Sequence, residues 1–297
     1  MALSPFCLRS LRFPRACKMC IQTRKISLGA PLMRAQSPQP EQSSLDSQSD
    51  AWFGYESVQN SEEKQRRVNE VFSSVAKKYD VMNDVMSLGV HRYWKDEFVR
   101  QCNVQSGMKV LDMAGGTGDI AFRISKQFPG AEVTVGDISE NMLKFGRKRA
   151  KKEIKNDENS KQITWTVADG QNLPFEDNQF DLYTVSFGIR NYGDLNKGVQ
   201  EAYRVLKPGG RFMCLEFSDV ENQLLKSVYD RYSMDFIPVF GAVVAGDWDS
   251  YKYLVESIRK FPNKTEFRDM ISNVGFKGAT YNSFLSGVAA IHSGFKL

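Results

Sequence analysis

The segment VLDMAGGTGDI, residues 110–120, joins a short apolar run to three glycines crowded into four positions, with Asp112 between them. A backbone without Cβ atoms lets a ligand approach closely. A glycine loop that follows a buried strand and opens a helix is typical of nucleotide-type cofactor sites. Two cofactor classes remain open at this point: a dinucleotide with its pyrophosphate, or a sulfonium cofactor that carries positive charge.

On both sides of this segment, apolar runs alternate with segments of helical periodicity. The expected strands are 108–114, 131–138, 161–169, 180–189 and 211–218, and the expected helices are 61–79, 91–101, 119–128, 139–154, 194–206 and 265–276. Ser139 is the expected N-cap of the helix that follows it. Alternation at this spacing predicts an α/β fold with a parallel, doubly wound sheet.

Three further segments modify this pattern. The sequence KPGG, residues 207–210, predicts a turn before the strand that follows. Residues 219–262 are rich in aromatic side chains and predict a helical cap insertion. Residues 278–297 predict two strands joined at Ser286-Gly287, a hairpin that adds one antiparallel strand to the sheet.

The choice between the two cofactors depends on the acids around the loop. Gly116, Gly118 and Ala121 fit the dinucleotide pattern G-x-G-x-x-A, which is weak evidence by itself. Asp112 precedes the loop, and Asp119 begins the following helix. A pyrophosphate requires that helix N-terminus free of negative charge. An ammonium or sulfonium group is instead attracted to these acids, so the pair favours S-adenosylmethionine.

Two more acids end neighbouring strands. Asp137 ends the second strand, where a carboxylate can accept hydrogen bonds from both ribose hydroxyls of either cofactor. Asp169 ends the third strand in the sequence VADGQNLPF, residues 167–175, where it can meet an adenine amino group. Leu173 and Phe175 supply apolar neighbours.

The N-terminal segment differs in composition from the rest of the chain. Residues 1–40 contain seven Lys and Arg and no acid. The positive charge of this segment alone exceeds the net charge of +5 of the whole chain. The remainder is slightly acidic, which removes the main support for nucleic-acid binding. An acid-free, Arg-rich N-terminus indicates a mitochondrial transit peptide, and the polar residues 36–50 indicate a disordered linker. We therefore expect a transit peptide and linker over 1–50 and one domain over 51–297.

Cysteine and histidine are too sparse for a metal site. The CxxC spacing at residues 17–20 has no second ligand pair nearby. Cys102 and Cys214 are expected as buried thiols, and His91 and His292 lie far apart in sequence. We expect no metal ion.

Three long motifs carry a resemblance to a known family: DMAGGTGDIAFR at 112–123, YDVMNDVMSLGVHRYWKD at 79–96, and SFGIRNYGDLNKGVQEAYRVLKPGGRFMCLEFS at 186–218. They resemble the ubiquinone/menaquinone biosynthesis C-methyltransferases, and the similarity extends over residues 51–297. The resemblance implies a class I methyltransferase (Rossmann-like) fold. Such a fold has a seven-stranded, mostly parallel sheet with one antiparallel strand, N-terminal helices and the helical cap insertion.

The resemblance also implies S-adenosylmethionine as the methyl donor and assigns roles to individual residues. The implied cofactor contacts are Thr117, Asp137, Asp169, Gly170 and Ser186, with close backbone approach at Gly115, Gly116 and Gly118 and a further acid at Asp112. The chain departs from the family pattern at Tyr192-Gly193, where a small apolar residue and a threonine are usual. It departs again at Gly170, where alanine is usual.

The implied reaction is C-methylation of a polyprenylated methoxy-benzoquinol in ubiquinone biosynthesis. A ring carbon becomes nucleophilic when the neighbouring phenol loses its proton, so the enzyme must assist deprotonation. Arg190 and Asn191 follow the fourth strand, where Arg190 can stabilise the phenolate; the alternative is a structural salt bridge. Tyr79 and Asp80 lie in the motif at 79–96, and Asp80 is the alternative base. For His91 we expect packing or capping.

The same resemblance suggests partners and a location. We expect a matrix-side position on the mitochondrial inner membrane, peripheral membrane contact, other enzymes of a coenzyme Q biosynthesis complex, a possible homodimer and no nucleic acid. Residues 224–254 are apolar enough to line a path for the lipid tail, or to serve as an ordinary helical cap. Two other functions remain open: a non-catalytic scaffold with a methyltransferase fold, and an NAD-dependent oxidoreductase.

Overall fold

The computed structural model describes residues 51–53, 56–58, 63–64, 66–68, 83–84, 87–154, 162–223, 226–227, 231–232 and 248–297. Residues 1–50 lie outside this set, so the transit peptide, the linker and the boundary at residue 51 stay predictions. Residues 63–64 and 66–68 are helical, within the helix expected over 61–79, whose remainder is outside the described residues.

The strands are β1 (Ala51–Phe53), β2 (Glu56–Val58), β3 (Lys109–Met113), β4 (Glu132–Asp137), β5 (Ile163–Val167), β6 (Phe180–Ser186), β7 (Leu206–Phe217), β8 (Lys277–Phe284) and β9 (Ala289–Phe295). The helices are α3 (His91–Cys102), α4 (Asp119–Gln127), α5 (Glu140–Glu153), α7 (Leu195–Val205), α10 (Trp248–Lys260) and α11 (Lys264–Val274), with the short 3₁₀ turns η1 (Ile189–Asn191) and η4 (Leu285–Gly287). The strand–helix alternation expected from the sequence is confirmed.

Seven strands form one sheet in the order β5-β4-β3-β6-β7-β9-β8, and β1 pairs separately with β2. The strands from β5 to β7 are parallel, and β9 runs antiparallel to both of its neighbours, which confirms the expected fold class. Chain order reverses between β3 and β6, because β4 lies on one side of β3 and β6 on the other. Ligands bind at such a switch point in open α/β sheets.

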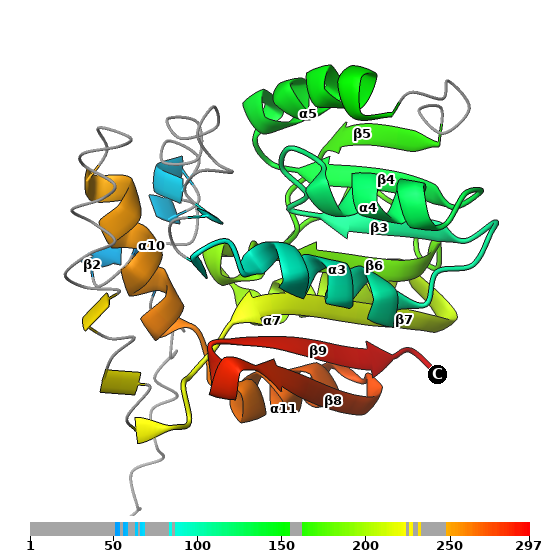
Figure 1. Ribbon diagram of the computed structural model, residues 1–297. Helices are drawn as coiled ribbons and strands as arrows, with labels where there is room; N and C mark the ends of the chain where they lie inside the picture. Colours follow the sequence, from blue (N-terminus) through cyan, green and yellow to red (C-terminus); the bar gives the residue numbers. More distant parts are fainter. Residues whose placement is uncertain are drawn as a thin grey trace, which may run out of the picture. The chain divides into compact units, whose positions relative to one another are not determined.

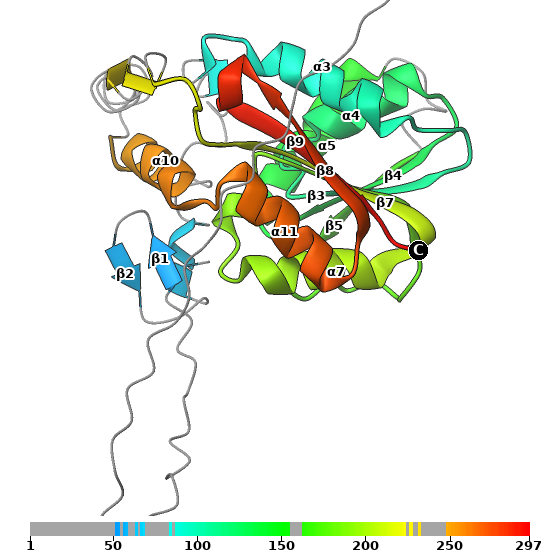
Figure 2. The same ribbon diagram turned by 90° about the horizontal axis from the view of Figure 1, so that it is seen from below.

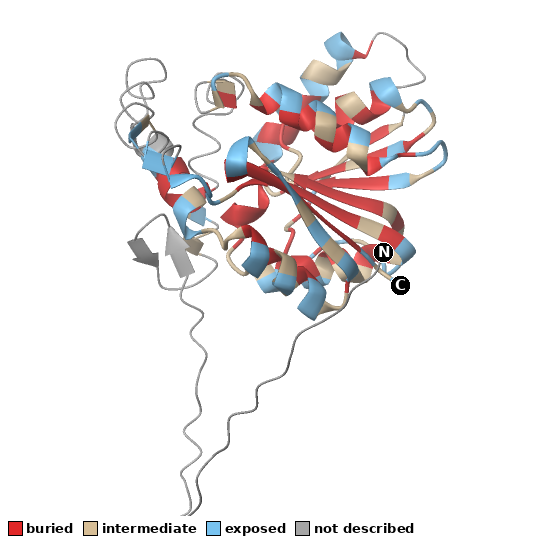
Figure 3. Cartoon of the chain, turned by 60° about the horizontal axis from the view of Figure 1, so that its bottom comes forward, coloured by how far each residue is buried: buried red, intermediate tan, exposed pale blue. Residues whose placement is uncertain are grey.

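Helices cover both faces of the sheet. Helices α3, α4 and α5 lie on one face, and α7 and α11 lie on the other (Figures 1 and 2). Successive residues of β3 enter opposite cores, since Val110 belongs to the cluster that contains Phe98 of α3 and Leu111 to the cluster that contains Phe267 of α11. The central strands are buried along most of their length (Figure 3).

The residues KPGG do not form a separate turn, because β7 already begins at Leu206 and continues through them. The pairing of β6 with β7 passes from Phe180–Leu206 directly to Leu182–Arg211. Residues 207–210 therefore form an irregularity within β7. Gly209 has φ +84° and donates its N–H to the carbonyl of Lys296 at 2.6 Å. This partner from the far end of the chain keeps the segment in the sheet.

Ser139 caps α5 as expected, because its side chain accepts a hydrogen bond from the Met142 N–H. Helix α10 lies within the expected cap insertion. Residues 224–225, 228–230 and 233–247 of that insertion are outside the described residues. Among the helices of the described ranges, none is long and apolar enough to span a membrane.

Substitution of a buried and of a partly exposed phenylalanine tests how much the core contributes to stability. Phe212 of β7 is fully buried between Tyr183 and Phe276, whereas Phe295 of β9 is 38% exposed. We expect Phe212→Ala to lower the free energy of unfolding by about 3–5 kcal/mol, because it leaves a cavity. The matched change Phe295→Ala should cost well under half of that. Urea denaturation of the full chain measures both, and equal losses would contradict this packing.

Candidate active site

Two adjoining cavities open at the carboxyl ends of the parallel strands. The first has a volume of about 570 Å³, and its lining includes Gly116, Asp137, Asp169, Gly170, Asn191 and Tyr192. The second has a volume of about 340 Å³, and its lining includes Lys95, Asp112, Gly115, Thr117, Asp119 and Ser186. Both are bounded by the glycine loop after β3, so the structure gathers most of the expected cofactor residues at the switch point of the sheet.

Asp137 joins two loops at the first cavity. Its Oδ2 accepts the Gly116 N–H at 2.8 Å, and its Oδ1 accepts the Ser139 N–H at 2.8 Å. Burial raises the pKa of Asp137 to about 6, and the two backbone hydrogen bonds oppose that rise. Each oxygen retains further acceptor capacity, because a carboxylate oxygen has more than one acceptor direction.

Gly118 is glycine because of packing and backbone conformation. It has φ +85°, and a Cβ there would lie 2.6 Å from the Trp165 ring. It is the N-cap of α4 and lines neither cavity in the described part of the chain. Gly115 has a different reason, since its Cβ would lie 2.8 Å from Asp112 Oδ2. The same Cβ would lie 2.7 Å from Val135 Cγ1, so Gly115 is a glycine because its neighbours leave no room for a side chain.

Two polar atoms of the second cavity have no hydrogen-bond partner among the described residues. They are Asp112 Oδ2 and Ser186 Oγ, and both are buried. The other oxygen of Asp112 accepts the Thr184 hydroxyl at 2.9 Å across the β3–β6 pair. Burial raises the pKa of Asp112 to about 7, against the hydrogen bond from Thr184. An unpaired buried carboxylate is costly, and a cationic ligand group offsets this cost.

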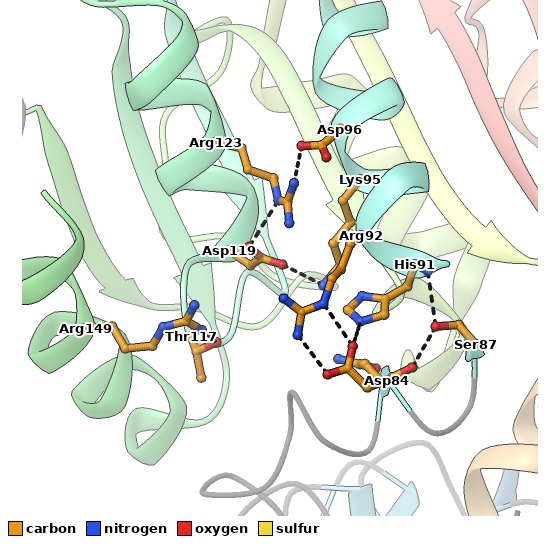
Figure 4. Close-up of polar contacts among 11 residues, drawn as sticks. Asp84, Ser87, His91, Arg92, Lys95, Asp96, Thr117, Asp119, Arg123 and Arg149 are labelled. Carbon is orange, nitrogen blue, oxygen red and sulfur yellow. Dashed lines mark hydrogen bonds and ion pairs between the residues drawn. The ribbon is translucent and has the colours of Figure 1, made fainter. Parts of the chain in front are cut away.

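A buried ammonium group faces the same cavity. Lys95 of α3 is 5% exposed, and its Nζ donates to Asp119 Oδ2 at 2.9 Å (Figure 4). Arg123 contacts the other oxygen of Asp119 and also pairs with Asp96. Burial acts to raise the pKa of Asp119, but Lys95 and Arg123 outweigh it and hold that pKa below its usual range. The second cavity thus presents the Lys95–Asp119 ion pair and one carboxylate oxygen, Asp112 Oδ2, without a partner among the described residues.

Thr117 lies at the tip of the loop, where its Oγ1 accepts from Arg149 of α5 at 2.9 Å. His91 begins α3, and its Nε2 contacts Asp84 Oδ1 at 2.9 Å, while Arg92 binds the same carboxylate (Figure 4). Burial lowers the pKa of His91. His91 lines neither cavity, and its burial agrees with packing, one of the two roles expected for it; the N-cap of α3 is Val90.

Arg190 does not present a free charge to the first cavity. It is buried, its Nη1 lies 3.1 Å from Glu216 Oε1 of β7, and it also donates to the Phe187 carbonyl. Its guanidinium lies over the Phe217 ring. The alternative expected for Arg190, a structural salt bridge, therefore describes its placement, and Glu216 is its partner among the described residues.

Of the two residues expected after the fourth strand, Arg190 and Asn191, it is Asn191 that lines the first cavity. Its Oδ1 accepts the Tyr253 hydroxyl of α10 at 3.0 Å, and both residues are buried. This bond fixes the carbonyl end of the amide and leaves its NH₂ end for another partner. Tyr79 and Asp80 lie outside the described residues, so their predicted catalytic roles stay predictions.

Comparison with known proteins identifies the family. Residues 59–296 match the ubiE/COQ5 methyltransferase family. The chain is 48% identical over 279 residues to the protein named "2-methoxy-6-polyprenyl-1,4-benzoquinol methylase, mitochondrial" from Homo sapiens, an alignment that covers 82% of this chain and 84% of that protein. The Dictyostelium discoideum protein of the same name is 48% identical over 270 residues, with 82% and 86% covered.

The chain belongs to the ubiE/COQ5 methyltransferase family.

Solved structures agree on the fold. A SAM-dependent methyltransferase from Thermotoga maritima, a possible histamine N-methyltransferase, superposes with a TM-score of 0.54 at 18% identity and covers 77% of this chain and 99% of its own. Phosphoethanolamine N-methyltransferase 2 from Haemonchus contortus, in complex with S-adenosyl-L-methionine, gives a TM-score of 0.51 at 18% identity, with 69% and 52% covered. At these identities the similarity shows the fold alone.

Two residues of the site were not expected from the sequence. Lys95 lies in the motif at 79–96, 24 residues before its partner Asp119. Glu216 lies in the motif at 186–218, 26 residues after Arg190. Glu216 is a charged residue inside an apolar run, which is the available signal, whereas Lys95 lies in a helix rich in charged residues and gives no such signal. Such residues are rarely fully buried unless they are paired.

The Arg190–Glu216 pair gives a test of stability. Glu216→Gln leaves a buried guanidinium without its counter-charge, so we expect a loss of about 3–5 kcal/mol in the free energy of unfolding. Arg190→Met should cost a similar amount, and the double variant Arg190→Met/Glu216→Leu clearly less than the sum. Urea denaturation of the three variants measures this coupling. Additive losses would mean that the two side chains do not act as a pair.

Proposed function

We propose that this chain is an S-adenosylmethionine-dependent C-methyltransferase that methylates the ring of a polyprenylated methoxy-benzoquinol in ubiquinone biosynthesis. Its relatives at 48% identity carry the name of this activity, and it belongs to their family. The observation that carries the proposal is the second cavity, where the Lys95 ammonium and the unpaired Asp112 oxygen lie together. The unpaired Asp112 oxygen fits the ammonium group of S-adenosylmethionine, and the Lys95 ammonium, which also pairs with Asp119, would be the cation nearest to its carboxylate.

The residues present fit the remainder of that cofactor. Asp112 Oδ2 and Ser186 Oγ would receive the ammonium group, and Lys95 would face the carboxylate. Asp137 would accept the ribose hydroxyls, with Asp169 and Gly170 beside the adenine. Thr117 and the backbone of the glycine loop would border the chain between them.

A dinucleotide fits the same site poorly. Asp119 occupies the first position of α4, and Asp112 lies beneath the loop. A pyrophosphate there would meet two carboxylates where it requires free N–H donors. This argues against an NAD-dependent oxidoreductase.

When bound, S-adenosylmethionine supplies an electrophilic methyl group. The protein must hold the quinol ring beside it and favour the ionised phenol, and good positioning is worth up to about 7–11 kcal/mol. The NH₂ group of Asn191, oriented by Tyr253, would donate to the phenolate oxygen in the first cavity. The Arg190–Glu216 pair would hold η1, and hence Asn191, in place. Asp80 remains the proposed alternative base, and Tyr79 remains a proposed catalytic residue beside it.

The proposal extends to location and partners. The relatives are named mitochondrial, and the acid-free N-terminal segment agrees with import into that organelle. A lipid-tailed substrate favours a place on the matrix side of the inner membrane, with peripheral membrane contact. Other coenzyme Q biosynthesis enzymes and a second copy of this chain are the proposed protein partners.

Calorimetric titration of the full chain with S-adenosylmethionine and, separately, NADH tests the cofactor. We expect binding of the first only. Asp137→Ala should weaken it about 10–100-fold, because hydrogen bonds to a charged group contribute about 1.5–3 kcal/mol. Lys95→Met should weaken it by a similar factor. A short-tailed methoxy-benzoquinol should then be methylated at carbon.

The matched control is Asp181→Ala, since Asp181 lies near the opposite end of β6 and pairs with Lys207. Its affinity for S-adenosylmethionine should equal that of the unmodified chain. Circular dichroism shows that each variant is folded. Tight NADH binding by the folded chain would falsify the proposal, as would binding of S-adenosylmethionine without any methyl transfer.

The acidity of Asp112 predicts a pH dependence. Only its ionised form attracts an ammonium group, and the pKa of Asp112 in the free protein is about 7. Affinity for S-adenosylhomocysteine should therefore rise with pH up to about 8, and it should fall about fivefold between pH 7 and pH 6 as Asp112 takes up a proton. Asp137, with a pKa of about 6, adds a second fall below pH 6. Asp112→Asn should bind weakly and retain only the lower step, measured by titration calorimetry at half-unit intervals.

A further inference from the structure

The ring of Tyr192 occupies a space between the first cavity and α7. Tyr192 follows η1, is 5% exposed, and lines the cavity together with Asp169 and Gly170. Its position is fixed from several sides. Its carbonyl accepts from Lys64 Nζ at 2.5 Å, and its hydroxyl lies 3.5 Å from the hydroxyl of Tyr183 in the sheet core.

Gly170 is a glycine because of this ring. A Cβ at Gly170 would lie 2.2 Å from Tyr192 Oη and 2.3 Å from Cζ, separations that no real Cβ adopts. Its backbone conformation would accept alanine, since Gly170 is not among the residues with positive φ. The ring alone therefore excludes a side chain at this position.

Gly198 shows the same relation from another element. It lies inside α7, where glycine is disfavoured relative to alanine, and it too has no positive φ. A Cβ at Gly198 would lie 2.4 Å from Tyr192 Cδ2. Two glycines from separate segments thus make room for one aromatic ring, and the ring in turn holds the Asp169–Gly170 turn against the cavity.

We propose that Tyr192 determines which purine bases the cofactor cavity accepts. The inference rests on the proposed function, in which the adenine lies beside Asp169 and Gly170. Tyr192 forms the wall at that end and excludes bases enlarged at the exocyclic amine. Because Tyr192 lines the cavity, removal of its ring creates a void that is continuous with it.

The test compares two ligands, S-adenosylhomocysteine and its N6-benzyl derivative, by calorimetry on the full chain. The unmodified chain should bind the benzyl derivative at least tenfold more weakly. Tyr192→Ala should reduce this ratio by at least tenfold, whereas Tyr192→Phe should keep it, because the ring remains. Tyr203→Ala, a matched change within α7, should also keep it.

A ratio in Tyr192→Ala equal to that of the unmodified chain would overturn the inference and leave the proposed function standing. The same ratio change in Tyr192→Phe as in Tyr192→Ala would also overturn it, since the hydroxyl rather than the ring would then be responsible. Failure of the folded, unmodified chain to bind S-adenosylhomocysteine would overturn both proposals.

A second set of variants tests the fit between ring and glycines. Gly170→Ala should weaken S-adenosylhomocysteine binding at least tenfold, and Gly170→Ala/Tyr192→Ala should recover most of that loss, because the added methyl enters the vacated space. Gly198→Ala should lower the melting temperature in the unmodified chain and raise it in the Tyr192→Ala background. Independent, additive effects at both glycines would contradict the proposed role of the ring.

Discussion

The carboxylate of Asp137 holds together the two loops from which the cavities are built. One oxygen accepts the Gly116 N–H of the loop after β3, and the other accepts the Ser139 N–H that precedes α5. The Gly115 N–H adds a second link to β4, because it donates to the Gly136 carbonyl at 3.1 Å. The cost is a carboxylate at the centre of the molecule, and the elevated pKa of Asp137 reflects it. Backbone donors lower that cost without bringing a side chain into the cavity.

Buried charge recurs around the site, and each case is resolved differently. Lys95 and Asp119 pair with each other, as do Arg190 and Glu216. Asp112 alone has an oxygen without a partner among the described residues. Buried pairs of this kind fix geometry more than they add stability. The paired charges therefore support the rigid frame, and the unpaired one marks where a ligand supplies the missing interaction.

The parts of the fold that local sequence encodes were predictable. Strand and helix periodicity, the Ser139 cap, the acid that ends β4 and the acid that follows β5 each depend on a few neighbouring residues. Contacts between distant segments were not predictable. Glu216 meets Arg190 only through the register of β6 with β7, and Lys95 meets Asp119 only through the packing of α3 on α4. KPGG was misread for the same reason, because its partner Lys296 is far away in sequence.

The mutual fit of Tyr192, Gly170 and Gly198 restricts how these positions can change during evolution. A tyrosine that arose opposite an alanine at either glycine position would collide with it. The tyrosine therefore cannot have arisen before the two glycines. Glycines that arose first would leave only a small void, which later substitution could fill. The three positions are therefore expected to vary together among homologues, and the history of the site should pass through small residues before the large one.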